Sequence, residues 1–292
     1  MANPSLGTLA ALWRFPVKSM LGEAVDDAHV GDRGIVGDRA YGLVERATGK
    51  VVSAKNVKAY PALLHCRATF VDAPRLGADA PPVRIDFPDG ATITSDAPDA
   101  NTALSRFFGR DVELRRAAPA DFTIDEYNLD LAKDDLGTEV AASLGSALWT
   151  KLGTRSPVPV GAFFDAFPLS LLTTATLARL GALRPQTRFD ARRFRMNVIV
   201  DAQASGFVEN GWVGRTLEIG DALRVRIVMP DPRCVITTLA QDGLPRDIEV
   251  LRTLTAHNRL PFADNTEKPC AGVYGVVVAP GSVAAGDAVR FV

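Results

Sequence analysis

Short strand-like runs, each closed by glycine, proline or aspartate, constrain the fold of this chain more than any other feature of its sequence. In the first 120 residues they occupy 9–15, 40–45, 62–71, 83–87, 91–94 and 111–115. Later runs occupy 168–173, 196–201, 216–219, 223–229, 234–239, 273–279 and 288–292. Helical patterns are few and short: 95–109 ending at Gly109, 174–180 with a threonine cap and Gly181 as its stop, and 248–258. The pattern predicts a mainly β fold with short helices (α+β), arranged as two β-barrel-like domains.

The boundary between these domains is expected near residue 120, within about ten residues. Residues 117–156 contain segments rich in Asp and Asn and show weak periodicity, which is typical of a linker or a loop. We therefore expect a first domain over residues 1–120 and a second over residues 121–292.

The charge balance excludes several classes of partner. The chain has 33 Lys+Arg and 34 Asp+Glu, a formal net charge of -1, so no overall positive field favours a nucleic acid polymer or an anionic membrane.

Residues 1–17 lack the apolar run of a signal peptide or a transmembrane helix. The three cysteines form no CxxC pair and no disulfide framework, which indicates a reducing compartment. We expect a cytoplasmic protein.

One cysteine has a setting that suits chemistry. Cys234 follows the Pro-Asp-Pro-Arg segment 230–233 and precedes a β-branched run. Beside Arg233, its thiol is expected to have a lowered pKa and to act as a thiolate, the form that binds soft metals and attacks electrophiles. A buried structural cysteine is the alternative. The three histidines lack the spacing of zinc ligands, and no GxSxG, Walker or GxGxxG motif is present.

Three cation-bearing segments suit the binding of a phosphate or another oxyanion. A strand end carries Lys18 and Ser19, segment 31–39 repeats Gly-Asp-Arg and ends at Arg39, and segment 188–197 contains four arginines. Glycine permits close approach of the backbone, while Lys, Ser and Arg supply hydrogen-bond donors. Ordinary β-turns and a solvent-exposed charge run remain alternatives. A further alternative is a β-barrel module that binds some other phosphorylated ligand through the first two segments.

These segments, taken in order, resemble the MOSC family (molybdenum cofactor sulfurase C-terminal domain) preceded by its N-terminal β-barrel domain. The resemblance rests on motifs at 15–19, 31–41, 167–173, 193–198, 212–220, 232–238 and 272–287, which span nearly the whole chain. It implies that a molybdenum cofactor, molybdopterin with molybdenum, binds between the two domains. Members with this layout resemble amidoxime-reducing and hydroxylaminopurine-detoxifying enzymes.

The resemblance also implies roles for individual residues. Cys234 matches the cysteine that binds molybdenum, and would be the catalytic residue. Lys18, Ser19 and Arg39 match positions that contact the phosphate and the pterin. Further residues expected to line the cofactor are Ser170, Thr173, Arg193, Asn197 and Arg233.

The reaction that the resemblance implies is a two-electron reduction of N-hydroxylated substrates: amidoximes, hydroxylamines or N-hydroxylated bases. The sequence contains no CxxxxCxxC run of an iron–sulfur module, so electrons are expected from a separate protein of the iron–sulfur, flavin or cytochrome type. The alternative is a molybdenum cofactor or sulfur carrier that acts through a persulfide or thiolate of Cys234 without turnover of a small molecule.

Overall fold

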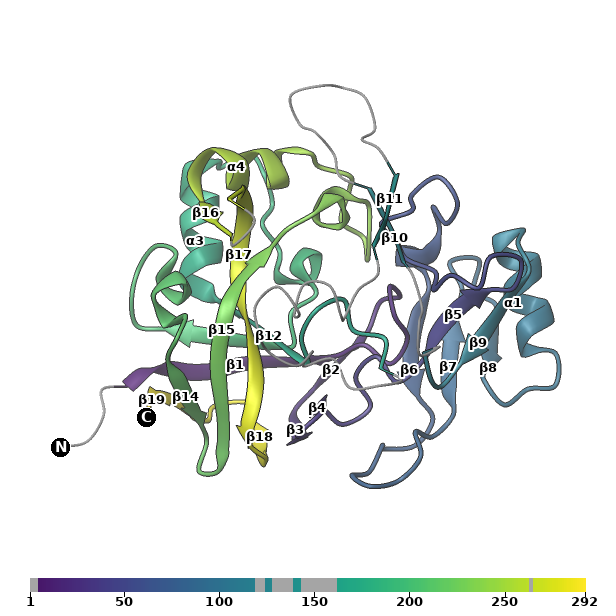
Figure 1. Cartoon of the computed structure of the whole chain (residues 1–292), viewed down its shortest axis with the longest axis horizontal. Helices are drawn as coiled ribbons and strands as arrows, with labels where there is room; N and C mark the ends of the chain where they lie inside the picture. The colour runs from purple at the N-terminus through teal and green to yellow at the C-terminus, as the bar shows by residue number, and fades with distance from the viewer. Residues whose placement is uncertain (1–4, 119–123, 128–138, 143–161, 263–264) are drawn as a thin grey trace.

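Seven strands close into a β-barrel. The computed structural model describes residues 5–118, 124–127, 139–142, 162–262 and 265–292. Around the barrel the order is β12 (Leu169–Thr173), β13 (Val198–Ala202), β1 (Ser5–Arg14), β19 (Ala288–Phe291), β14 (Thr216–Ile219), β15 (Leu223–Pro232) and β17 (Glu267–Ala279). β17 pairs with β12 and closes the barrel; β12 and β13 are parallel, and the other neighbours are antiparallel. β2 (Glu23–Val25) pairs with β1, and β16 (Arg259–Pro261) pairs with β17 (Figure 1).

A bulge in β1 sets which of its side chains enter the barrel. Leu9 and Leu12 are both buried in the barrel core, although a spacing of three places residues on opposite faces of a regular strand. The register against β13 shifts between Leu9 and Ala11, and the extra residue turns Leu12 inward again. Beyond the bulge, the chain leads through Trp13 to Phe15, where the barrel meets the rest of the first 118 residues.

The remaining strands form smaller sheets, most of them on the right of Figure 1. β3 (Asp27–Gly31) lies between β4 (Gly34–Ile35) and β18 (Gly281–Ala284), and β5 (Gly42–Glu45) pairs with β9 (Val112–Arg115). β6 (Arg67–Phe70), β7 (Val83–Asp86) and β8 (Thr92–Thr94) form a third sheet, and β10 (Ile124–Tyr127) pairs with β11 (Glu139–Ala142). The apolar residues of β3, β4 and β18 join the barrel core. A second core, separate from that of the barrel, lies among β5, β6, β7, β9, η1 (Leu63–His65) and α1 (Ala100–Phe108), and includes Leu43, Leu63, Ile85 and Leu104.

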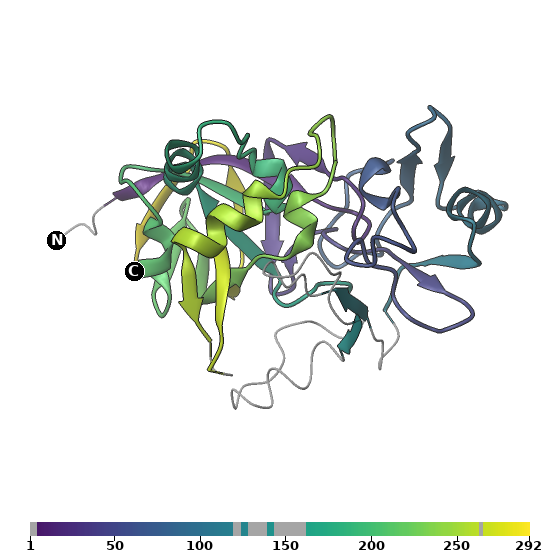
Figure 2. The ribbon, with the colours of Figure 1, turned by 90° about the horizontal axis from the view of Figure 1, so that it is seen from above.

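Three short α-helices complete the described fold. α1 (Ala100–Phe108) ends at Gly109, whose φ of 64° is the left-handed conformation favoured at helix ends. α3 (Thr174–Leu183) and α4 (Glu249–His257) lie at the top of the barrel in Figure 1 and nearest the viewer in Figure 2. Four 3-10 turns are η1 (Leu63–His65), η2 (Ala191–Phe194), η3 (Val208–Trp212) and η4 (Val235–Thr238). No helix among the described residues is long and apolar enough to cross a membrane.

The prediction of a mainly β fold is confirmed, but three local predictions are wrong. Residues 235–238 form η4 rather than a strand, because the hydroxyls of Thr237 and Thr238 donate to carbonyls three residues earlier, at 3.0 and 2.8 Å. Gly181 lies inside α3, which continues to Leu183. The expected strand over 62–71 begins with the turn η1, and β6 starts only at Arg67.

The predicted domain boundary near residue 120 stays a prediction, because residues 119–123 lie outside the described ranges. The described strands on the two sides of it share one sheet. β1, from the first 120 residues, is hydrogen-bonded to β13 on one side and to β19 on the other.

Candidate functional site

Cys234 lies on the loop between β15 and η4, where the barrel meets the second apolar core, the one that contains Leu43 and Ile85. A hydrogen bond from the Arg233 amide to the Pro269 carbonyl, at 2.8 Å, fixes this loop to β17. Ile236, one turn further, is buried in the apolar core of the first 118 residues, and Cys234 packs against the same core. The loop at the end of β15 therefore places the thiol of Cys234 in contact with the apolar core of the first 118 residues.

Burial raises the pKa of the Cys234 thiol above its ordinary value, while Lys55, the Ile236 amide and Arg233 lower it only in part. The expectation of a lowered pKa is thus wrong for the chain by itself. A metal ion at the sulfur would have to displace its proton. Cys66 and Cys270 are also free thiols, and burial raises the pKa of each to about 12. Among the described residues, no three His, Cys, Asp or Glu side chains come close enough to hold a metal ion together.

Lys18 is buried at the same junction. Its Nζ atom donates to the Phe163 carbonyl at 3.0 Å and forms an ion pair with Asp165, which lies on the segment leading into β12. Burial lowers the pKa of Lys18, and Asp165 opposes that change. The next residue, Ser19, accepts a hydrogen bond at Oγ from the Ala54 amide at 3.1 Å. The loop that contains Lys18 is therefore tied to both halves of the chain.

Three residues around the site have left-handed backbones. Ser19, Arg39 and Arg195 have φ values of 64°, 47° and 53°, a region that side chains with a Cβ atom rarely adopt. Such conformations cost about 1–3 kcal/mol each and persist where the surrounding structure fixes them, often at functional sites. Two of the three were expected site residues, and Arg195 joins them here.

Asp38 connects Arg39 to the barrel. Its carboxylate accepts from the Phe15 amide at 2.8 Å and from Nδ2 of Asn197 at 3.0 Å, and it forms an ion pair with Arg39. Asn197 is held in turn by Ser170, whose amide and hydroxyl lie 3.2 and 3.1 Å from its Oδ1. Ser170 and Asn197 therefore act on Arg39 through Asp38.

Two other expected site residues bind protein groups instead of facing the cation cluster. Thr173 is the N-cap of α3, where it accepts from the Thr176 amide and donates to Glu209 at 2.7 Å. The Arg193 guanidinium is fully buried. It donates to four backbone carbonyls: those of Arg188, Thr237, Leu239 and Pro245. Arg193 therefore supports the segment that follows Cys234.

The structure adds charged residues that sequence reasoning missed. The positive charge of Lys55 lowers the pKa of the Cys234 thiol. The positive charges of Arg39 and Arg233 lower the pKa of Arg195. Asp231 forms an ion pair with Arg233. One sequence signal was available for Lys55, because the polar run 53–56 follows two valines at 51–52, and the structure buries its Ser, Lys and Asn side chains.

Together these groups carry an excess of positive charge. Three carboxylates and five cations form one electrostatically connected cluster, which reaches Cys234 through Lys55, Arg233 and Asp165. Its members are Asp38, Asp165, Asp231, Lys18, Arg39, Lys55, Arg195 and Arg233. The excess of two positive charges within this described cluster matches a phosphate monoester, which carries nearly two negative charges at neutral pH. Nε of Arg233 is buried and has no hydrogen-bond partner among the described residues, so it is available to a ligand. The residues therefore fit a phosphate-bearing cofactor with a soft metal at Cys234.

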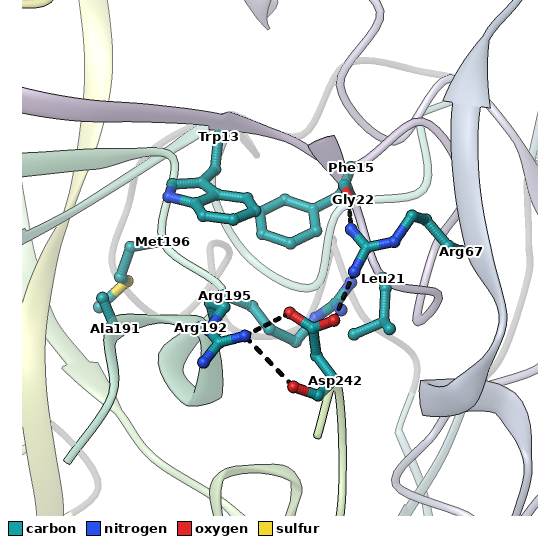
Figure 3. Close-up of a pocket in the computed structure, with 10 residues that line it drawn as sticks. All are labelled: Trp13, Phe15, Leu21, Gly22, Arg67, Ala191, Arg192, Arg195, Met196 and Asp242. Carbon is teal, nitrogen blue, oxygen red and sulfur yellow. Dashed lines mark hydrogen bonds and ion pairs between the residues drawn. The ribbon is translucent and has the colours of Figure 1, made fainter. Parts of the chain in front are cut away.

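A narrow pocket has one residue of this cluster, Arg195, in its lining (Figure 3). One wall consists of the rings of Trp13 and Phe15, which are 6.5 Å apart and inclined by 21°. The opposite wall contains Asp242, which accepts from Arg67 of β6 at 2.5 Å and from Arg192 of η2 at 2.7 Å (Figure 3). Because the two arginines come from the two halves of the chain, Asp242 connects these halves beside the site.

Several known proteins are similar to this chain. It is 26% identical over 314 residues to the mitochondrial amidoxime-reducing component 1 of Homo sapiens, a match that covers 97% of this chain and 82% of that protein. It is 28% identical over 303 residues to the mitochondrial amidoxime reducing component 2 of Macaca fascicularis, covering 97% and 83%. Among solved structures, the YuaD protein from Bacillus subtilis gives a TM-score of 0.40 at 11% identity, covering 98% and 94%.

Two family models match the chain in succession. The MOSC N-terminal beta barrel domain matches residues 6–120, and the MOSC domain matches residues 159–290. The first range contains Lys18 and Arg39, and the second contains Cys234. Because these ranges take in most of the chain and both sides of the site, the protein belongs to the MOSC family and carries its N-terminal β-barrel domain.

Proposed function

We propose that this protein binds a molybdenum cofactor and reduces N-hydroxylated small molecules. The observation that carries the proposal is the position of Cys234, a single soft ligand next to a cluster with two excess positive charges. The similarity to proteins named amidoxime-reducing components supports the choice of reaction.

The residues divide into those that hold the cofactor and those that position them. Cys234 would bind the metal, and Lys18, Lys55, Arg39, Arg195 and Arg233 would hold the phosphate and the pterin. Asp38 orients Arg39, and Arg193 fixes the loop of Cys234 through backbone carbonyls. When bound, the cofactor supplies a centre that takes up and passes on two electrons.

The overall reaction needs a source of electrons outside the chain. Reduction of one N–OH group consumes two electrons and two protons, breaks the N–O bond, and yields N–H and water. The electrons would come from a separate iron–sulfur, flavin or cytochrome protein. We place this reaction in the cytoplasm, where three free cysteines would remain reduced.

The test begins with metal and pterin analysis of protein expressed in a host that makes the cofactor. We expect close to one molybdenum per chain, and reduction of benzamidoxime or hydroxylaminopurine when a chemical reductant is supplied. Cys234→Ala should lose the metal, the activity or both. Cys66→Ala is the matched control, because Cys66 is also a free thiol but is buried in the core of the first 118 residues.

Three outcomes would contradict parts of the proposal. Protein without molybdenum or pterin would exclude the cofactor. Loaded protein that leaves both substrates unchanged in the presence of reductant would exclude the substrate class. An added sulfur on Cys234 by mass spectrometry, with transfer of cofactor to an apo-enzyme and no reduction, would establish a carrier instead.

A further inference from the structure

The ring of Phe15 contacts two guanidinium groups of the candidate site. The Cζ atoms of Arg39 and Arg195 each lie 4.4 Å from the ring centroid, and Phe15 is only 4% exposed. A cation within about 6 Å of a ring centroid is attracted to the negative face of the ring, and more strongly where water is excluded. Figure 3 shows the Phe15 ring beside Arg195 on the wall of the pocket.

These two arginines would otherwise repel each other. Burial and then the nearby Arg39 lower the pKa of Arg195 to about 9. Arg39 has Asp38 as an ion-pair partner, whereas Arg195 forms no ion pair with any described residue and donates to the Met20 carbonyl at 2.7 Å. Asp165 and Asp38 attract its charge without forming an ion pair with it, so the direct contacts of its guanidinium group described here are with neutral groups, and the Phe15 ring is one of them.

The backbone around Phe15 couples the ring to Arg39 as well. The Phe15 amide donates to Asp38 at 2.8 Å, and the Arg39 amide donates to the Phe15 carbonyl at 2.8 Å. One Nη atom of Arg39 donates to the Arg195 carbonyl at 3.2 Å. Ring, carboxylate and both arginines therefore form one connected unit, although they come from three separate segments of the chain.

We propose that Phe15 is a positioning residue whose ring holds Arg39 and Arg195 together, so that both guanidinium groups bind one anion at the Cys234 site. The inference rests on the proposed function in one respect: it takes the bound anion to be the phosphate group of the cofactor. Phe15 itself touches neither metal nor substrate in this scheme. An aliphatic side chain of similar size fills the same space but lacks the charge distribution of the ring.

The experiment measures binding of inorganic phosphate to the cofactor-free full chain by calorimetry, with the midpoint of chemical unfolding measured for every variant. Phe15→Leu should weaken phosphate binding about tenfold, and Phe15→Tyr should keep the affinity within about threefold of the wild type. Phe87→Leu is the matched control, because Phe87 is buried in the core of the first 118 residues and packs on Phe107 with centroids 4.5 Å apart. It should lower the unfolding midpoint without changing phosphate affinity.

The proposal is overturned if Phe15→Leu binds phosphate as tightly as the wild type, if Phe15→Tyr binds as weakly as Phe15→Leu, or if Phe87→Leu loses as much affinity as Phe15→Leu. A wild-type chain that binds no phosphate overturns it too. Failure of the proposed function gives a different result: phosphate binding that depends on Phe15, in a protein that contains neither molybdenum nor pterin.

Discussion

Replacing Arg195 by methionine should make the cofactor-free protein more stable while weakening its hold on an anion. Burial and then Arg39 lower the pKa of Arg195 from its ordinary value to about 9. At 1.36 kcal/mol for each pH unit, the charged form is destabilised by up to ~5 kcal/mol. Methionine removes that cost but loses the hydrogen bond to Met20 and the contact with Phe15, each about 1 kcal/mol. We expect a net gain of about 1–3 kcal/mol.

The free energy of unfolding is measured in urea on cofactor-free protein, and pterin content on protein from a cofactor-producing host. Arg226→Met is the control, since this exposed arginine of β15 should change stability by less than about 0.5 kcal/mol. In the unfolded chain Arg195 binds its proton more tightly than in the folded protein, so wild-type stability rises as the pH increases above 9, and the gain of the variant shrinks there. An Arg195→Met protein less stable than the wild type at pH 7, or with unchanged pterin content, refutes the reasoning.

Three further changes test other parts of the structure. Arg193→Met should lower the free energy of unfolding by at least about 2 kcal/mol and reduce cofactor content, because buried carbonyls lose their donor; an unchanged urea midpoint would contradict this. Glu209→Gln should have a larger free energy of unfolding than the wild type, and the difference should grow as the pH rises above 4.5, because burial raises the pKa of the wild-type carboxyl group. A difference that stays constant between pH 5 and 8 would count against this explanation. Asp242→Asn should cost about 1–2 kcal/mol at low salt and less in 1 M NaCl, since its ion pairs are screened; an equal loss in both would argue against a charge effect.

The strand pattern could be predicted from the sequence because local residues decide it. Gly, Pro and Asp interrupt apolar runs at the places where strands end, and most of the expected strands lie within a few residues of those observed. The exception at 235–238 is instructive. Two β-branched threonines favour a strand, but their hydroxyls bond to carbonyls three residues earlier and stabilise a helical turn.

The candidate site could be predicted only in part, since its groups meet through contacts distant in sequence. Lys18 and Arg39 were expected from glycine-bearing and hydroxyl-bearing loops, and the structure places both in the cation cluster. The partner of Lys18 lies 147 residues away, so nothing in the local sequence pointed to Asp165. Arg193 and Arg195 share one arginine-rich segment, and only the fold shows that the first binds carbonyls while the second faces Arg39.

The pairing of β1 with β19 sets a temporal order on the assembly of this protein. Ser5 lies opposite Arg290, so the first described strand can complete its pairing only after the last described strand has been synthesised. Until then the part of β1 that pairs with β19, from Ser5 to Thr8, lacks that partner, and contacts of such long range form slowly. Because the barrel carries the loop of Cys234 to the rest of the site, any group bound there must enter after the ribosome has finished the strands of the barrel.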